Sequence, residues 1–173
     1  MMRLPTQWAI MGPLLFLALP AFPCTCVKGV NFNAWTEMTD SHVSLVFRGA
    51  VVQSRVLPPR AEMKGRGRYA ITFRVDEYWK GAPGRSVTLY AIDEGTDCLG
   101  GSEYEIGKSY LVYASEQDAK DVILPGENFW YGWTDILQEG TKMLVPTACT
   151  PGGKTSDVQK AIRQLGKGRI PAK

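Results

Sequence analysis

Apolar and polar residues alternate in several stretches of the chain, which is the pattern of half-buried β-strands. The clearest stretch is residues 69–75, where four large apolar side chains alternate with small or polar ones. Residues 45–52 predict another strand, and Gly49 within it indicates a bend or bulge. Shorter strands are predicted at residues 87–91, 110–114, 136–137 and 143–145.

Two segments show helical spacing of their apolar residues instead. The first covers residues 30–40, where Asn31 or Asn33 fits the N-cap position. The second covers residues 158–165, whose apolar side chains fall on one face. Its expected caps are Thr155 or Ser156 at the start and Gly166 at the end.

Short strands, glycine-rich turns and two peripheral helices together predict a mainly β fold, a small closed or nearly closed barrel. Residues 117–133 fit this barrel least well, and we interpret them as an elaboration on it.

Residues 1–23 are predicted to be an export signal. A single charge, Arg3, precedes an apolar run at residues 8–19 that is too short to span a bilayer comfortably. We therefore expect a secreted protein, periplasmic or extracellular, with no membrane span after the signal is removed. Two cleavage positions are open: cleavage after Ala21 makes Phe22 the first residue, whereas cleavage after Pro23 makes Cys24 the first.

The remaining chain suffices for one domain, at residues 24–150, followed by a helical tail at residues 151–173. The whole sequence carries 20 Lys and Arg against 17 Asp and Glu, a net charge of +3. Arg3 is the only charge in the leader, so the mature chain is close to neutral. This balance gives no argument for binding nucleic acid.

Residues 55–68 are predicted to form a long, mobile hairpin loop, because they contain prolines and glycines. The loop is basic: five Lys and Arg residues, from Arg55 to Arg68, are opposed only by Glu62. A basic loop on a barrel can contact acidic glycans or nucleic acid. Export and the lack of aromatic residues argue against nucleic acid, and we expect a solvated loop.

Four cysteines, Cys24, Cys26, Cys98 and Cys149, follow the leader. An even number in an exported chain predicts disulfide bonds. Cysteines separated by one residue do not easily bridge each other, so Cys24 and Cys26 are each expected to reach Cys98 or Cys149. A zinc site of four thiolates is the alternative, but the chain lacks the paired Cys-x-x-Cys knuckles of such sites.

The sequence offers no assembled catalytic group. His42 is the only histidine, which argues against a histidine metal site or a histidine-activated nucleophile. The acidic pairs Asp76–Glu77 and Asp93–Glu94 are expected at strand ends, where solvated carboxylates are normal. We therefore expect a protein that is not an enzyme and that holds no cofactor or metal of its own.

Phe129, Trp130, Tyr131 and Trp133 form the densest aromatic cluster of the chain. Exposed aromatic residues form ligand surfaces for sugars or proline-rich peptides. The alternative, which we favour, is that these side chains pack against one end of the barrel.

Several short motifs, taken in order, resemble those of a known superfamily. They are Cys-x-Cys after the leader, Val-Phe-Arg-Gly at 46–49, Thr-Phe-Arg-Val at 72–75, Tyr-Trp-Lys-Gly at 78–81, Cys98, Gly-Lys-Ser-Tyr-Leu-Val-Tyr at 107–113 and Cys149. The set resembles the superfamily of the tissue inhibitors of metalloproteinases, specifically its short single-domain members with the netrin-like module. The resemblance covers residues 24–150.

The resemblance implies an OB-type five-stranded barrel and two disulfides, Cys24 to Cys98 and Cys26 to Cys149. It also implies inhibition of a zinc metalloproteinase, in which the free amine and carbonyl of Cys24 chelate the protease's zinc.

In such an inhibitor, Thr25 would enter the primed-side pocket of the protease. Thr96 and Asp97, beside Cys98, would form the second part of the contact. The alternative is a purely structural role for the Cys-x-Cys pair, on a non-inhibitory extracellular module that binds a protein or a glycan.

Overall fold

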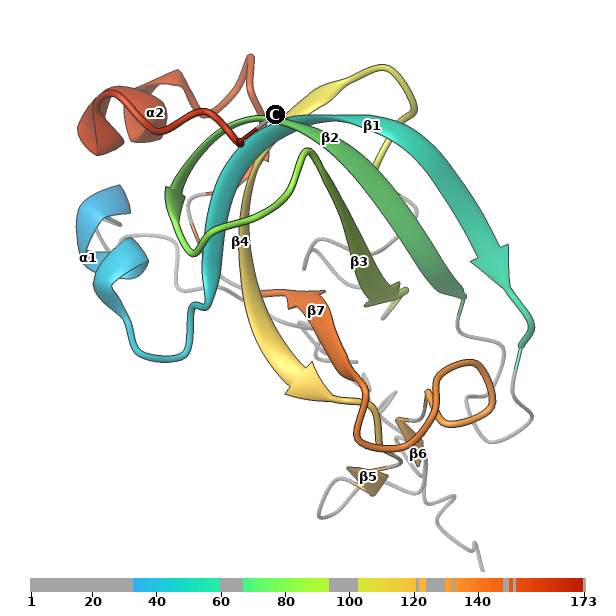
Figure 1. Ribbon diagram of the computed structural model, residues 1–173. Coiled ribbons are helices and arrows are strands. Elements are labelled where there is room, and N and C mark those ends of the chain that lie inside the picture. Colours follow the sequence, from blue (N-terminus) through green and yellow to red (C-terminus); the bar gives the residue numbers. More distant parts are fainter. Residues whose placement is uncertain are drawn as a thin grey trace, which may run out of the picture.

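Five strands form a closed barrel in a computed structural model of the chain, shown in Figure 1. The structure describes residues 33–59, 67–93, 103–120, 133–147, 150 and 152–172, and the backbone of 122–123 and 130–131. The barrel strands are β1 (Leu45–Leu57), β2 (Arg68–Lys80), β3 (Ser86–Ile92), β4 (Ser109–Asp118) and β7 (Lys142–Pro146).

The strand order around the barrel is β1-β2-β3-β7-β4, and pairing between β4 and β1 closes the ring. Neighbouring strands are antiparallel except β3 and β7, which run parallel where Leu89 pairs with Leu144. This arrangement is an OB-type five-stranded barrel, so the predicted fold class is confirmed.

A glycine permits the sharp curvature of β1 that is visible in Figure 1. The register between β1 and β2 shifts at three places, one of them between Arg48 and Gly49. A Cβ at position 49 would lie 2.5 Å from the backbone oxygen of Arg74, a distance that real side chains do not tolerate. The bulge expected at Gly49 is therefore confirmed, and it depends on the missing side chain.

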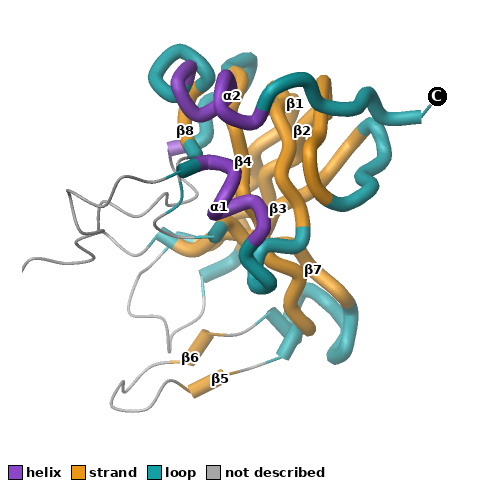
Figure 2. The backbone as a smooth tube through the Cα atoms, turned by 90° about the vertical axis from the view of Figure 1, so that its left-hand side faces the viewer, coloured by secondary structure: helices purple, strands orange, loops and turns teal. Residues whose placement is uncertain are grey.

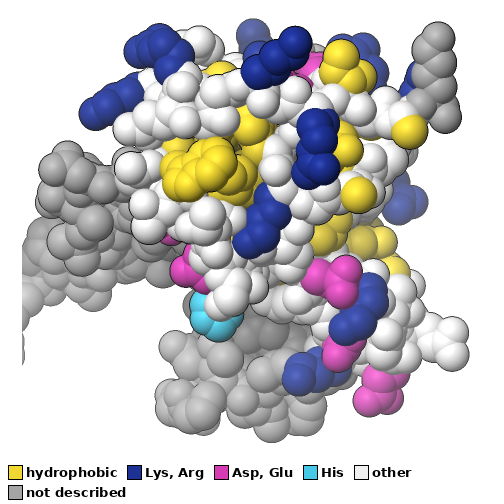
Figure 3. All heavy atoms as spheres, turned by 60° about the vertical axis from the view of Figure 1, so that its left-hand side comes forward, with side chains coloured by type: hydrophobic (Ala, Val, Ile, Leu, Met, Phe, Trp, Pro, Cys, Tyr) yellow, Lys and Arg dark blue, Asp and Glu magenta, His cyan; other side chains and the backbone are white. Residues whose placement is uncertain are grey.

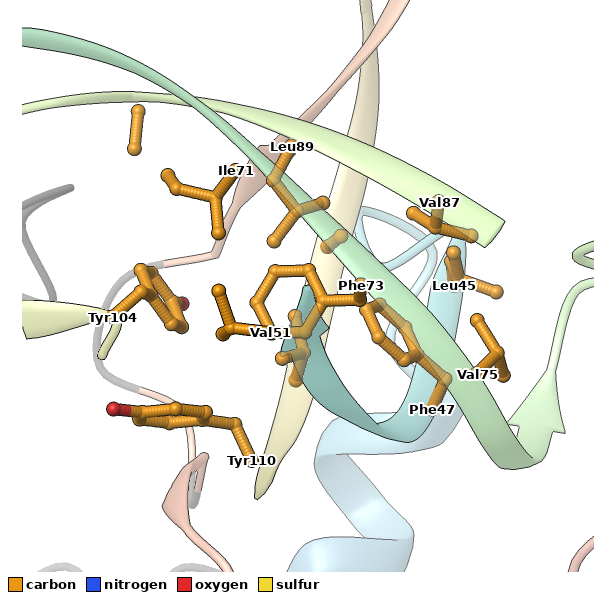
Figure 4. Packing of buried hydrophobic residues seen from close by; sticks show 13 residues of the cluster. Leu45, Phe47, Val51, Ile71, Phe73, Val75, Val87, Leu89, Tyr104 and Tyr110 are labelled. Atoms are coloured by element: carbon orange, nitrogen blue, oxygen red, sulfur yellow. The ribbon is translucent and has the colours of Figure 1, made fainter. Parts of the chain in front are cut away.

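Apolar side chains fill the barrel interior, as Figure 4 shows. Phe47 and Phe73 are fully buried and meet edge to face, with ring centroids 5.3 Å apart. Tyr104 and Tyr110 lie beside them, and their own centroids are 5.0 Å apart. The edge-to-face arrangement matches the positive ring edges to the negative faces, which favours this packing over parallel stacking.

β1 and β2 are longer than the alternation pattern predicted. Arg55 belongs to β1, where it pairs with Ala70, and Arg68 begins β2 opposite Leu57. The predicted loop at residues 55–68 is therefore wrong at both ends, and residues 60–66 lie outside the described part. Arg68 is also not solvated, because its side chain is completely buried.

The two helices α1 (Ala34–Thr39) and α2 (Gln159–Leu165) lie together on one side of the barrel, as Figure 2 shows. They cover the outer face of β1 and β4 and form a second apolar cluster there. Its buried members are Ala34, Met38, Val43, Val46, Leu111, Tyr113, Ala161 and Leu165.

The helix caps follow the sequence prediction only in part. Asn33 caps α1, where its side-chain oxygen accepts a hydrogen bond from Trp35 N at 2.9 Å, and Gly166 ends α2. Val158 occupies the N-cap of α2, so the expected cap at Thr155 or Ser156 is wrong. Their hydroxyls are used elsewhere: Thr155 donates to the Ser109 carbonyl, and Ser156 donates to the carboxylate of Asp157.

The chain around α2 is tied to the barrel on both sides of the helix. The short strand β8 (Gly153–Lys154) pairs with the start of β4. After α2, the backbone of Arg169 exchanges two hydrogen bonds with Tyr78, each 2.8 Å long. Residues 152–171 therefore pack as part of the barrel body.

A third apolar cluster lies around Trp133 and includes Leu57, Ala70, Ala119 and Met143. Residues 136–137, predicted as a strand, form a turn: the backbone N–H groups of both residues donate to the Trp133 carbonyl. That strand prediction is wrong, because a short apolar run also suits a turn that covers a sheet. Nearby, β5 (Val122–Ile123) and β6 (Trp130–Tyr131) form a separate two-stranded sheet.

The Gly49→Ala substitution should destabilise the fold by about 1–3 kcal/mol, because the new methyl group overlaps the β2 backbone. Gly84→Ala is the matched control, since a Cβ there meets its nearest atom only at 4.0 Å. We expect that control to stay within about 0.5 kcal/mol of the wild type in urea unfolding. Equal stabilities of the two variants would contradict the role assigned to Gly49.

Candidate functional site

The residues predicted to contact a protease lie outside the described part of the chain. They are Cys24, Thr25, Cys26, Thr96 and Asp97, and the same holds for Cys98 and Cys149. The disulfide pairing accordingly stays a prediction. The structure does show how the residues that flank these cysteine segments are attached to the barrel.

The chain after Cys26 is fixed where α1 begins. Ala34 is fully buried, and its N–H donates to the side-chain oxygen of Gln164 in α2 at 3.1 Å. Its carbonyl accepts a hydrogen bond from the hydroxyl of Tyr113 in β4 at 3.2 Å. Both polar groups of this buried residue are therefore satisfied by distant segments, which locks the entry into α1.

Tyr113 stays protonated over the whole physiological pH range. Burial raises the pKa of its hydroxyl above the ordinary value, and the nearby carboxylate of Glu37 raises the pKa further. The hydroxyl can therefore always donate to Ala34.

The chain before Cys149 is held by the same strand. Thr147 N donates to the carbonyl of Tyr113 at 2.9 Å, and its hydroxyl bonds to the hydroxyl of Ser115 at 2.9 Å. The hydroxyl of Thr150 in turn donates to the Thr147 carbonyl. Tyr113 thus contacts the flanks of two predicted cysteine segments, one through its side chain and one through its backbone.

The segment around Cys98 leaves the barrel at Asp93 and returns at Glu103. The hydroxyl of Tyr69 donates to the Asp93 carboxylate at 3.1 Å. The carbonyl of Glu103 accepts a hydrogen bond from Tyr110 at 2.9 Å. Both ends are therefore tied to barrel strands.

Sequence reasoning did not identify the anchors on Tyr113, because they join residues far apart in the chain. The hydroxyl of Tyr113 reaches a residue 79 positions away. A tyrosine inside the apolar run at residues 110–114 was the only available signal, since a buried tyrosine hydroxyl usually needs a partner.

The remaining polar candidates have structural partners. His42 is exposed, and its backbone N–H donates to the side chain of Asp40 at 2.7 Å. Asp76 and Glu77 lie inside β2, so their expected position at a strand end is wrong. Glu77 forms an ion pair with Arg48 at 3.1 Å.

Arg68 and Trp133 pack together beside the third apolar cluster. The Arg68 guanidinium binds both carboxylate oxygens of Asp135, at 2.8 and 2.6 Å, and also the Pro58 carbonyl. It lies 5.7 Å from the centre of the Trp133 ring, which is only 4% exposed. Trp133 is therefore packed in the structure, as the favoured interpretation of the aromatic cluster expects. Phe129 lies outside the described residues, as do the side chains of Trp130 and Tyr131.

A shallow hollow of about 340 Å³ opens beside Trp133. In it, Lys142 lies 2.7 Å from Asp118 and 3.8 Å from Glu116. Hydrogen bonding to Lys142 lowers the pKa of Asp118, and the same contact raises the pKa of Lys142. Asp118 and Lys142 are thus both charged at neutral pH and compensate each other, which is the arrangement of a solvated ion pair.

Within the residues that the structure describes, no group of three or more His, Cys, Asp or Glu side chains is placed to hold a metal ion. The same residues include no helix of the length and apolar character needed to cross a bilayer. Comparisons with protein-family models, with curated proteins and with solved structures found no match.

Tyr113→Phe should destabilise the protein by about 0.5–1.5 kcal/mol, because it removes the hydrogen bond between the buried Tyr113 hydroxyl and the Ala34 carbonyl. Tyr90→Phe is the control: Tyr90 is half-buried against Trp133, and no hydrogen bond of its hydroxyl is seen within the described residues. Urea unfolding measures both effects. A loss for Tyr90→Phe as large as for Tyr113→Phe would refute the anchoring role.

Asp135→Ala should cost about 1–3 kcal/mol, since it leaves the buried guanidinium of Arg68 without its carboxylate. Asp76→Ala provides a matched control. The two aspartates have nearly equal side-chain exposure, 36% and 35%, but the partner of Asp76 is Arg74, which is 66% exposed. An exposed pair contributes about 0–1 kcal/mol, so thermal unfolding should separate the two variants.

Proposed function

We propose that this chain is an exported inhibitor of zinc metalloproteinases that acts through the amine and carbonyl of Cys24. The observation that carries the proposal is the closed OB-type barrel, which is the fold that the sequence resemblance implies. The anchoring of Ala34 and Thr147 on Tyr113 supports it further, because these residues flank the segments of Cys26 and Cys149.

The inhibitory chemistry follows from the ligands that a catalytic zinc accepts. Such a zinc keeps one position open for water or substrate. An α-amine has a pKa of about 8, so a useful fraction is neutral at physiological pH and can donate its lone pair to the metal. The amine and the neighbouring carbonyl of Cys24 would together displace the water that attacks the peptide.

Rigid attachment determines whether such a ligand binds tightly. A free chain end pays a large entropic cost when it is ordered on a partner, and attachment before binding reduces that cost. In the proposed inhibitor, the bridges from Cys24 and Cys26 provide this attachment. Thr25 then points into the primed-side pocket, with Thr96 and Asp97 beside it.

The alternative function is a non-inhibitory extracellular module that binds a protein or a glycan. Two of the features that suggested a ligand surface are buried in the structure, namely Arg68 and Trp133. The binding module therefore has less support than the inhibitor.

The test compares two forms of the protein that differ only at the N-terminus. One begins at Cys24 and the other retains Phe22 and Pro23, which convert the amine of Cys24 into an amide. We expect the first to inhibit cleavage of a fluorogenic peptide by a zinc endopeptidase, and the second to be weaker by about 100-fold, or about 3 kcal/mol.

The pH dependence provides a second readout. Inhibition by the Cys24-first form should strengthen by about tenfold per pH unit as the pH rises toward 8, because the amine loses its proton. The extended form should lack this dependence. Equal inhibition by both forms, or none by the Cys24-first form across a panel of zinc endopeptidases, would overturn the proposal.

A further inference from the structure

Positive charge is concentrated on the C-terminal segment that crosses the outside of the barrel. Lys160, Arg163, Lys167 and Arg169, here called the basic surface, are all exposed. Asp157 is the only acidic residue among residues 152–172. In the described part of the chain, none of the four basic side chains takes part in an ion pair. The chain as a whole is nearly neutral, so this local excess of charge is a distinct feature.

The packing of α2 directs two of these charges outward. Ala161 and Leu165 are buried against the barrel. With 3.6 residues per turn, Lys160 and Arg163 fall on the opposite side of the helix, facing solvent. The helix is fixed by apolar contacts and by the hydrogen bond from Ala34 N to Gln164, and neither charge takes part in them.

Gly168 and Arg169, which follow α2, are held against β2. Gly168 N donates to the carboxylate of Glu77 at 2.7 Å, and the guanidinium of Arg169 lies 4.7 Å from the centre of the Tyr78 ring. Lys167 and Arg169 therefore extend the charge of α2 along a segment that is fixed to β2.

Exposed apolar side chains accompany the basic surface. Ile170 is 81% exposed, and Trp35, on the helix that packs against α2, is 55% exposed. Figure 3 shows the helix side of the molecule: Lys and Arg side chains surround a hydrophobic patch in the upper half, and most acidic side chains lie lower.

We propose that this face binds the surface of membranes that contain anionic lipids. Anionic headgroups complement the four positive charges, and the interfacial layer takes up tryptophan and isoleucine side chains. A sulfated glycan would complement the charges equally well, but it offers no apolar phase for Ile170. The contact is peripheral, and it does not depend on the inhibitory mechanism proposed above.

The test uses the mature exported protein and sedimentation with vesicles. Vesicles of phosphatidylcholine with phosphatidylglycerol should bind the protein, vesicles of phosphatidylcholine alone should not, and raised salt should release it. Each basic residue near an anionic surface contributes about fivefold in affinity, so the double variant Lys160→Gln/Arg163→Gln should bind about 25-fold more weakly.

The control removes the same charge elsewhere. Arg55 and Lys120 are exposed near the ends of β1 and β4 that lie away from α2 in Figure 1. The variant Arg55→Gln/Lys120→Gln should keep its affinity within about twofold, since charges beyond a Debye length are screened. Thermal unfolding of both variants should match the wild type, because none of the four substituted side chains forms an ion pair within the described residues.

Three results would overturn the proposal. The first is a wild-type protein that does not bind anionic vesicles, and the second is a control variant that loses as much affinity as Lys160→Gln/Arg163→Gln. The third is binding to an immobilised sulfated polysaccharide without binding to the vesicles, which would assign the surface to a glycan.

Discussion

The pairing of β1 on both of its edges is the constraint on which the structure depends. Its first half lies between β2 and β4, and this contact turns a curved sheet into a closed barrel. Closure removes the open sheet edges in this region and encloses the core around Phe47 and Phe73. Val46, on the opposite face of the same strand, belongs to the cluster beneath the helices. One strand therefore organises both the barrel interior and the outer layer, and its bend requires glycine at position 49.

The sequence predicted the elements whose signal is local, and missed those that depend on distant partners. Strict alternation located β2, and helical spacing with an asparagine cap located α1. The full length of β1 and β2 was not visible, because Arg68 resembles a loop residue until Asp135, 67 positions away, is known to neutralise it. The cap of α2 was assigned wrongly for the same reason: Thr155 bonds to β4 instead of to its own helix. Of the candidate site, the sequence supplied the cysteines and their neighbours, whereas the anchors on Tyr113 emerged only from the three-dimensional arrangement.

These anchors connect the fold to the proposed function. An inhibitor that acts through its first residue needs a chain end that is attached to a rigid body, and the closed barrel provides such a body. Tyr113 bonds to Ala34 through its hydroxyl and to Thr147 through its carbonyl, so the segments leading from Cys26 and to Cys149 are attached to one position of β4. The segment of Cys98 is attached separately, at Asp93 and Glu103. The basic surface beside α2 shares no residue with the predicted protease contact.

The central claim is that this barrel holds a free Cys24 amine in place through two bridges to distant segments. Peptide mapping of the exported protein by mass spectrometry, under non-reducing conditions, tests it most directly. The account predicts a chain that begins at Cys24, with Cys24 linked to Cys98 and Cys26 linked to Cys149. A chain that begins at Phe22, exchanged partners or free thiols would contradict it.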